Sequence, residues 1–148
     1  MDAANRFETP TTFALVRIEY AAVLAVSVVL TAVHHADVDW RVFAALFAVV
    51  DVIGYVPGAI AFRATGGRPP KVFYVLYNVM HSITTWVAIL GTLSLLAAPQ
   101  WAFLAIAIHL AGDRSIFGNS LKSFRVSFEP AVHPAFRRFE DALAERGS

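Results

Sequence analysis

Hydrophobic residues run along this chain in four long blocks that short polar stretches separate. The blocks cover about residues 12–33, 40–62, 72–97 and 101–118. A block of about 20 apolar residues is long enough, as an α-helix, to cross the roughly 30 Å hydrocarbon core of a bilayer. The pattern therefore predicts an all-α fold, a four-helix transmembrane bundle that makes one integral membrane domain of residues 1–148.

The residues after the fourth block, 119–148, are predicted to form a cytoplasmic tail. Within this tail, residues 134–146 can form a short amphipathic helix. Its apolar residues fall on one stripe, made of Phe136, Phe139 and Leu143. The pattern is typical of a helix that lies in the membrane interface, although a helix docked on the protein itself has the same pattern.

The composition agrees with a membrane location. Apolar residues make up 57% of the chain and charged residues 16%, which lies outside the range of ordinary soluble domains. The absence of cysteine excludes disulfides, thiolate metal sites and cysteine nucleophiles. The N-terminal residues lack the basic region and cleavage site of a signal peptide, so we expect the first block to be retained as a helix.

Basic residues set the expected orientation. With four spans, the N-terminus, the second loop and the tail share one side of the membrane, and Arg41 is the only basic residue on the other side. The basic residues on the shared side are Arg6, Arg17, Arg63, Arg68, Lys71, Arg114, Lys122, Arg125, Arg137, Arg138 and Arg146. The positive-inside rule therefore predicts that both termini face the cytoplasm. Since topology explains these charges, we expect the lipid bilayer and no nucleic acid as a partner, and we leave homo-oligomerisation open.

Polar residues also lie inside the blocks, where they are costly and usually face the interior of a bundle or a wet cavity. Asp51 lies near the middle of the second block, and Tyr55 follows one turn later. Three residues of the third block share one helical face because they are three and four residues apart. They are Tyr77, Asn78 and His81.

The fourth and first blocks add further polar residues at a similar depth. His109 and Asp113 are four residues apart and share a face, while Arg114 points about 100° away. Glu19 lies near the cytoplasmic end of the first block. Each charged residue, taken singly, is also explained by an ion pair that stabilises the bundle. Together they predict one polar pocket in the cytoplasm-proximal half of the membrane.

Several of these residues form an ordered set of motifs. In chain order the motifs are Arg17-x-Glu19, Asp51 before Gly54-Tyr55, Tyr77-Asn78-x-x-His81 and His109-x-x-x-Asp113-Arg114. The set resembles a family of small bacterial four-helix integral membrane proteins of unknown function, over about residues 13–122. The resemblance implies this fold, a bacterial inner-membrane location and one shared site for the polar residues, and it implies no activity. The chain departs from the family at residues 117–119, where a Gly-Tyr-Gly-like stretch is expected.

The chemistry of this residue set supports three hypotheses. In the first, the protein is a membrane-embedded enzyme that isomerises, cyclises or hydrolyses a lipophilic small molecule by acid/base catalysis. Asp51 and Asp113 would be the acid and the base. His81 and His109 would orient them or shuttle protons. The residues expected to contact the substrate are Glu19, Tyr55, Tyr77, Asn78 and Arg114.

In the second hypothesis, the same residues bind a divalent metal ion. His109 and Asp113 can both reach one ion from successive turns, and His81 is the third candidate ligand. Candidates to complete the shell are Asn78, Asp51 and Glu19. Such a mixed set of nitrogen and oxygen donors suits Zn²⁺, Fe²⁺ or Mn²⁺.

In the third hypothesis, the protein is no enzyme but a proton or ion pathway, or a subunit of a membrane assembly. Proton relays use chains of Asp and His residues of this kind. The polar residues, however, crowd into one half of the membrane and leave the other half apolar. This distribution favours a closed pocket over a pore.

Overall fold

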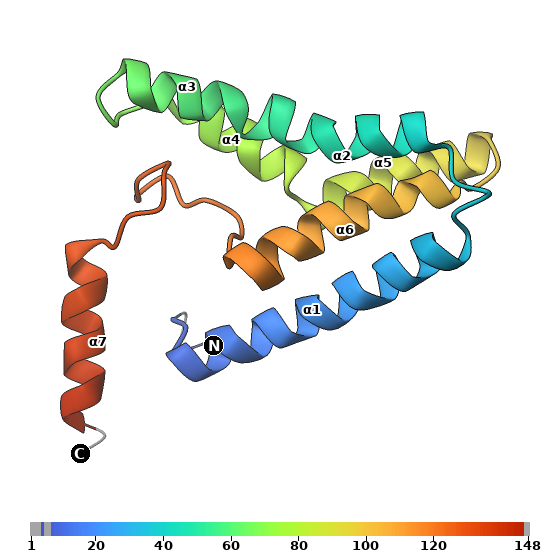
Figure 1. Cartoon of the computed structure of the whole chain (residues 1–148). Coiled ribbons are helices and arrows are strands. Elements are labelled where there is room, and N and C mark those ends of the chain that lie inside the picture. Colours follow the sequence, from blue (N-terminus) through green and yellow to red (C-terminus); the bar gives the residue numbers. More distant parts are fainter. Residues whose placement is uncertain (1–3, 5–6, 147–148) are drawn as a thin grey trace.

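In a computed structural model, the chain folds into helices joined by short connections (Figure 1). The structure describes Ala4 and residues 7–146, and over these residues all regular structure is helical, as the apolar blocks predict. The α-helices are α1 (Pro10–Val33), α2 (Trp40–Gly54), α3 (Val56–Ala64), α4 (Lys71–Met80), α5 (Ile83–Leu96), α6 (Leu104–Gly112) and α7 (Pro134–Arg146). Two turns of other helical types flank α6, a 3-10 turn η1 (Trp101–Phe103) and a π-helical turn η2 (Asp113–Phe117).

Two stretches are long and apolar enough to cross a membrane as helices. They are Pro10–Val33, which is α1, and Trp40–Ala64, which joins α2 and α3 across an interruption at Tyr55. Pro57 causes this interruption because proline has no amide hydrogen to donate to the preceding turn. Both stretches agree with the first two blocks of the sequence.

The third and fourth blocks do not form uninterrupted helices. The axes of α4 and α5 differ by 52°, so this pair is a third candidate span only if both helices are counted as one bent span. The fourth block is divided into η1, α6 and η2. The prediction that Tyr77, His81 and the residues beyond lie on one continuous helix is therefore wrong, because α4 ends at Met80.

Side chains satisfy the backbone groups that the break between α4 and α5 leaves unpaired. The indole of Trp86 donates to the carbonyl oxygen of Met80 at 2.6 Å. The guanidinium of Arg114 donates to the carbonyl oxygens of His81 at 2.9 Å and Leu110 at 3.0 Å. Non-helical backbone is tolerated at membrane depth only where such partners exist. The break is thus held by bonds from α5 and η2.

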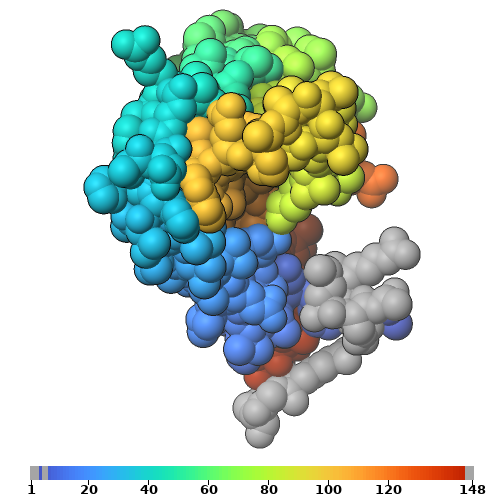
Figure 2. All heavy atoms as spheres, turned by 90° about the vertical axis from the view of Figure 1, so that its right-hand side faces the viewer, coloured from blue at the N-terminus to red at the C-terminus, as the bar shows by residue number. Residues whose placement is uncertain are grey.

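Helix α6 lies at the centre of the fold. It packs against α1 on one side and α2 on the other, and Figure 1 shows it between them. The buried residues concentrate on it: Ala105, Ile106, His109, Leu110 and Ala111. Figure 2 looks onto the end of the molecule where α6 begins. There the orange-yellow start of α6 is bordered by the cyan α1–α2 connection and by the yellow-green of α5.

The outer helices expose large apolar side chains. In α1 only Ser27 and Thr31 are buried, whereas Ile18 is 65% exposed and Val33 68% exposed. So much exposed apolar surface on a long helix is typical of a face that contacts lipid. The outer surface therefore agrees with an integral membrane protein.

Helix α7 forms over the residues that the amphipathic pattern predicts. It stands apart from the other helices and crosswise to α1, near the start of α1 (Figure 1). The rings of Phe7 and Phe139 lie 4.8 Å apart, so α7 contacts the segment that precedes α1.

Candidate functional site

Four ionisable side chains from three helical regions meet at the point where α4 ends. Asp51 comes from α2, His81 from the end of α4, and His109 and Asp113 from α6 and η2. His81 Nε2 lies 3.4 Å from Asp51 Oδ1 and 3.3 Å from Asp113 Oδ2. His109 Nε2 lies 3.7 Å and 3.6 Å from the same two oxygens. The structure thus brings together all four residues that the first hypothesis makes acid, base or proton shuttle.

The hydrogen-bond partners of the two imidazoles determine what they offer to the site. His81 Nδ1 lies 3.0 Å from the carbonyl oxygen of Tyr77, which can only accept, so Nδ1 carries the hydrogen. In the neutral ring, Nε2 then presents its lone pair to the two carboxylates. His109 is buried, and among the residues that the structure describes neither of its ring nitrogens has a hydrogen-bond partner. Buried polar atoms nearly always have a hydrogen-bond partner, so the two nitrogens of His109 require an explanation.

The separations between nitrogens and oxygens are too long for hydrogen bonds. Nitrogen and oxygen atoms in a hydrogen bond lie about 2.7–3.2 Å apart. The four separations here are 3.3–3.7 Å. Ligand atoms at about 2.0–2.2 Å from one tetrahedral zinc ion lie about 3.3–3.6 Å from one another. Ligating atoms of Asp51, His81 and His109 all lie within 4.8 Å of one another, as a shared ion requires.

A glycine on α2 leaves room for one of these imidazoles. A Cβ atom on Gly54 would lie 2.7 Å from Cβ of Met80 and 3.1 Å from Nδ1 of His81. The absence of a side chain at Gly54 therefore lets the end of α4 approach α2. The π-helical turn acts on the other side, since it shifts the backbone that carries Asp113 relative to a regular helix.

The site lies in the wall of a polar pocket of about 280 Å³. The lining residues are Asp51, Tyr55, Tyr77, His81, Asp113, Phe117, Asn119, Lys122, Glu129 and Pro130. The imidazoles are almost fully buried, with side-chain exposures of 4% for His81 and 5% for His109. Asp51 is 47% exposed and Asp113 19%. The carboxylates therefore face the space that a ligand would enter, and the imidazoles lie behind them.

The chain after η2 closes one side of this pocket. We refer to residues 119–130 as the cap. The side-chain amide of Asn78 donates to the carbonyl oxygen of Lys122 at 2.9 Å and accepts from the amide of Lys122 at 2.7 Å. The hydroxyl of Tyr74 donates to the carbonyl oxygen of Val126 at 2.9 Å. Two side chains of α4 thus hold the backbone of the cap.

An aromatic anchor and a polar bond complete the attachment of the cap. Phe128 is fully buried among Tyr74 and Tyr77, and its ring occupies the space where a Cβ atom of Gly58 would lie. The hydroxyl of Tyr55 donates to the carboxylate of Glu129, at 3.0 and 3.1 Å from its two oxygens. The cap is therefore a packed part of the site.

Three residues predicted to contact substrate are placed differently by the structure. Asn78 holds the cap backbone, as described above. Arg114 is buried on the carbonyl oxygens of His81 and Leu110, and its guanidinium lies 5.1 Å from the ring of Tyr20. It therefore stabilises the helix break.

Glu19 lies outside the polar pocket and is exposed. Arg17, two residues earlier on α1, donates to the carbonyl oxygens of Ser115 and Ile116 at 2.8 and 2.9 Å. Residues two apart on a helix point about 200° apart, so packing Arg17 on η2 turns Glu19 away from the site. The structure therefore places Glu19 apart from the polar pocket that the other predicted site residues line.

Two pocket residues, Lys122 and Glu129, were not recognised from the sequence. In the sequence, Lys122 is one of many basic residues that the positive-inside rule explains. Glu129 follows Phe128 in a segment without helical or strand periodicity, so no pattern predicted that this segment packs on α4. A single buried aromatic residue in an irregular segment leaves no periodic signal.

Comparisons with family models, curated proteins and solved structures found none that matches this chain. The family resemblance noted in the sequence therefore stays a prediction. What the site does must be argued from its geometry.

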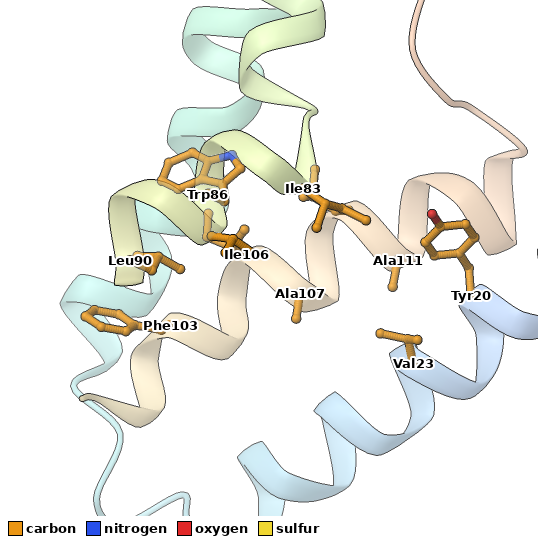
Figure 3. A pocket seen from close by; sticks show the side chains of 11 residues that line it. Tyr20, Val23, Ile83, Trp86, Leu90, Phe103, Ile106, Ala107 and Ala111 are labelled. Atoms are coloured by element: carbon orange, nitrogen blue, oxygen red, sulfur yellow. The ribbon is translucent and has the colours of Figure 1, made fainter. Parts of the chain in front are cut away.

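A second pocket of similar size, about 270 Å³, lies between α1, α5 and α6 (Figure 3). Its lining is almost wholly apolar and includes Val23, Ile83, Trp86, Leu90, Phe103, Ile106 and Ala107. Figure 3 shows these side chains converging from the three helices. It shares no lining residue with the polar pocket.

Proposed function

We propose that the chain crosses the membrane four times, with both termini in the cytoplasm of a bacterial cell. Two continuous spans, the bent pair α4–α5 and the η1–α6–η2 segment would supply the four crossings. The last segment runs from Trp101 to Phe117 and is about 26 Å long at helical rise, which is short for a span. The positive-inside asymmetry of the sequence supports the orientation. Arg6, one of the residues counted there, lies outside the described residues.

We further propose that Asp51, His81 and His109 bind one divalent metal ion and leave one coordination position open, with the carboxylate of Asp113 beside the two imidazoles. The observation that carries this proposal is the set of four nitrogen–oxygen separations of 3.3–3.7 Å around two buried imidazoles. A protonated imidazole beside a carboxylate would form a shorter, charge-assisted hydrogen bond of about 2.7–2.9 Å. An ion between the groups accounts both for the spacing and for the partnerless nitrogens of His109.

Charge supports the same proposal. Two carboxylates in the membrane interior carry a charge that the bilayer cannot solvate, and one divalent cation with two neutral imidazoles balances it. The bond from His81 Nδ1 to the Tyr77 carbonyl is the kind of outer contact that orients a ligating histidine. The nitrogen and oxygen donors favour Zn²⁺, with Fe²⁺ and Mn²⁺ as the other candidates.

The proposed activity is metal-assisted hydrolysis of a lipophilic small molecule that enters the polar pocket. A bound divalent ion supplies Lewis-acid polarisation and activation of water at neutral pH. The exposed carboxylate of Asp51 places the site at the wall of a pocket, which favours access for a substrate. Tyr77 and Lys122 line the same space and offer groups that can position a substrate oxygen.

An apolar cluster beside the site argues against an ion pathway. Val50, Trp86, Ile106 and Leu110 are buried together, with Leu46 and Leu90 packed on them. These residues lie on α2, α5 and α6 next to Asp51 and His109, on the side away from the cap. A path for ions or protons across the membrane would need polar groups or water there. The packing supports a site that opens on one side.

The test is elemental analysis of the purified protein beside two matched variants. His81→Ala removes a proposed ligand, and His35→Ala removes an exposed histidine outside the site. We expect about one Zn²⁺, Fe²⁺ or Mn²⁺ per chain in the wild type and in His35→Ala, and loss of the metal in His81→Ala. Absence of metal from the wild type, even after incubation with each ion, would reject the metal centre and leave a metal-free acid/base pocket.

A further inference from the structure

A positively charged side chain lines the polar pocket without an ion pair. Lys122 is partly buried, and among the described residues no carboxylate lies within 4.0 Å of its Nζ. Glu129, the acid nearest to it in the cap, accepts from the hydroxyl of Tyr55 instead. Burial lowers the pKa of Lys122, against the opposing effect of the negative charges of Glu129 and Asp113. Lys122 is therefore a partly buried cation that no carboxylate contacts directly, and such a cation can bind an anionic group that enters the pocket.

The ammonium group is held in a fixed place. Nζ donates to the carbonyl oxygen of Phe128 at 2.5 Å and lies 4.5 Å from the centre of the Tyr77 ring. An ammonium has three donors, and the bond to Phe128 uses one. The remaining donors are available to a ligand in the pocket that Lys122 lines.

One aromatic ring separates this ammonium from the proposed metal centre. The ring of Tyr77 stacks on His81 with centroids 3.8 Å apart and planes at 10°. Lys122 lies over the same ring. The ammonium and the carboxylates of Asp51 and Asp113 line the same pocket.

The position of Lys122 does not depend on its own side chain. Its backbone amide and carbonyl are both bonded to the side chain of Asn78. A substitution of the side chain therefore leaves the cap attached at this point. A variant of the side chain keeps these two backbone bonds and loses the bond from Nζ to the Phe128 carbonyl oxygen.

We propose that Lys122 binds the phosphate group of the substrate, which is an amphiphile with a phosphate monoester headgroup. This proposal rests on the metal centre proposed above. A phosphate has three acceptor oxygens, which suits binding by a metal ion on one side and a lysine on the other. Phe117 also lines the pocket and is 72% exposed, so an apolar chain attached to the headgroup has a surface to follow into the membrane.

The test is calorimetric titration of the zinc-loaded full chain, in a neutral detergent, with dodecyl phosphate and with inorganic phosphate. Lys122→Met removes the charge and keeps the length of the side chain. Arg125→Met removes an exposed charge from the same cap and is the matched control. We expect Lys122→Met to raise the Kd for dodecyl phosphate by about 10-fold or more, as for loss of a charge-assisted hydrogen bond. Arg125→Met should change it by less than about 2-fold, and Lys122→Arg should restore most of the binding.

The two phosphate probes distinguish the source of the headgroup. Tighter binding of dodecyl phosphate than of inorganic phosphate supports an amphiphile. If dodecyl phosphate and inorganic phosphate bind equally well and both lose affinity in Lys122→Met, the phosphate subsite stands and the proposal that the substrate is an amphiphile is rejected. If Lys122→Met does not fold, Lys122→Gln, which keeps an N–H donor without the charge, takes its place.

Metal content measured in the same samples separates the two proposals. If the wild type holds a full complement of metal but does not bind phosphate, the phosphate subsite is rejected and the metal centre stands. The same conclusion follows if phosphate binds equally well to the wild type and to Lys122→Met. Absence of metal from all samples rejects the proposed function itself. Retained metal in Lys122→Met with weakened phosphate binding is the result we expect.

Discussion

The polar pocket and the apolar pocket described above have nearly the same volume and opposite chemistry. The apolar pocket lies between α1, α5 and α6, and its lining residues come from these α-helices except for Phe103 of the 3-10 turn η1 (Figure 3). The polar pocket lies where helices are interrupted: at Tyr55, at the break after Met80, and at the π-helical turn. In this chain, polar groups gather where the backbone leaves the regular helix.

The comparison indicates why the interruptions occur at that place. A regular helix presents neighbouring side chains about 100° apart, which limits how many can converge on one point. Because α4 ends beside His81 and the helix widens after Gly112, both imidazoles come close to the two carboxylates. The cost of the broken backbone is offset by the bonds from Trp86 and Arg114. The apolar pocket needs no such device.

The largest expected effect is the loss of a ligand to the metal. Asp51→Asn should weaken zinc binding by more than about 100-fold. Loss of a residue that only hydrogen-bonds to a ligand already lowers metal affinity by about 10–100-fold, and Asp51 is a proposed ligand itself. The measurement is a competition titration of the purified protein against a zinc chelator. Asp37→Asn, an exposed acid in the α1–α2 connection, is the control and should bind zinc as the wild type does. Equal binding by Asp51→Asn would remove Asp51 from the centre.

The next effect tests the close approach of α2 and α4. Gly54→Ala places a Cβ atom 2.7 Å from Cβ of Met80 and 3.1 Å from the His81 ring, so the ring must move. In the same competition titration we expect zinc affinity to fall by about 10–100-fold, which is the usual effect of losing a contact that orients a metal ligand. Gly91→Ala on α5 meets no atom within 4 Å and is the matched control. If both variants bind zinc alike, the position of His81 does not depend on Gly54.

A smaller effect is expected when the cap is loosened. Asn78→Ala leaves two backbone groups of Lys122 without their partner, which costs about 1–3 kcal/mol. Amide hydrogen exchange, followed by mass spectrometry, should speed up over residues 119–130 and stay unchanged in α1. Ser94→Ala removes a side-chain bond within α5 and should leave the cap protected. Unchanged exchange of the cap in Asn78→Ala would mean that the bonds from Tyr74 and Tyr55 and the packing of Phe128 are enough to hold it.

The smallest effect is expected in the apolar pocket. Ala107→Leu adds three carbon atoms to a side chain that lines this pocket and replaces none of the proposed ligands. Zinc affinity should change by less than about 2-fold, because the two pockets share no lining residue. A tenfold change in the chelator competition would show that the two pockets are coupled through α6.

The helices and the convergence of the site residues can be predicted from the sequence. The helix break and the packing of the cap cannot, because they depend on contacts between residues far apart in the chain. The apolar blocks predict helices, and the polar residues at helical spacing predict that Asp51, His81, His109 and Asp113 converge. The break after Met80 was not predicted, because no proline or glycine stands there and the stabilising bonds come from residues far along the chain. Packing of Phe128 against Gly58 is likewise a long-range contact that no local pattern encodes.

The direct test of the account is the coordination of the ion itself. X-ray absorption fine structure of the zinc-loaded wild type reports the ligand atoms around the metal. The account predicts nitrogen and oxygen ligands at about 2.0–2.2 Å, with outer-shell scattering from two imidazoles, and from one imidazole only in His109→Ala. A wild-type spectrum with no imidazole, or the same spectrum in wild type and His109→Ala, would contradict a centre shared by α4 and α6.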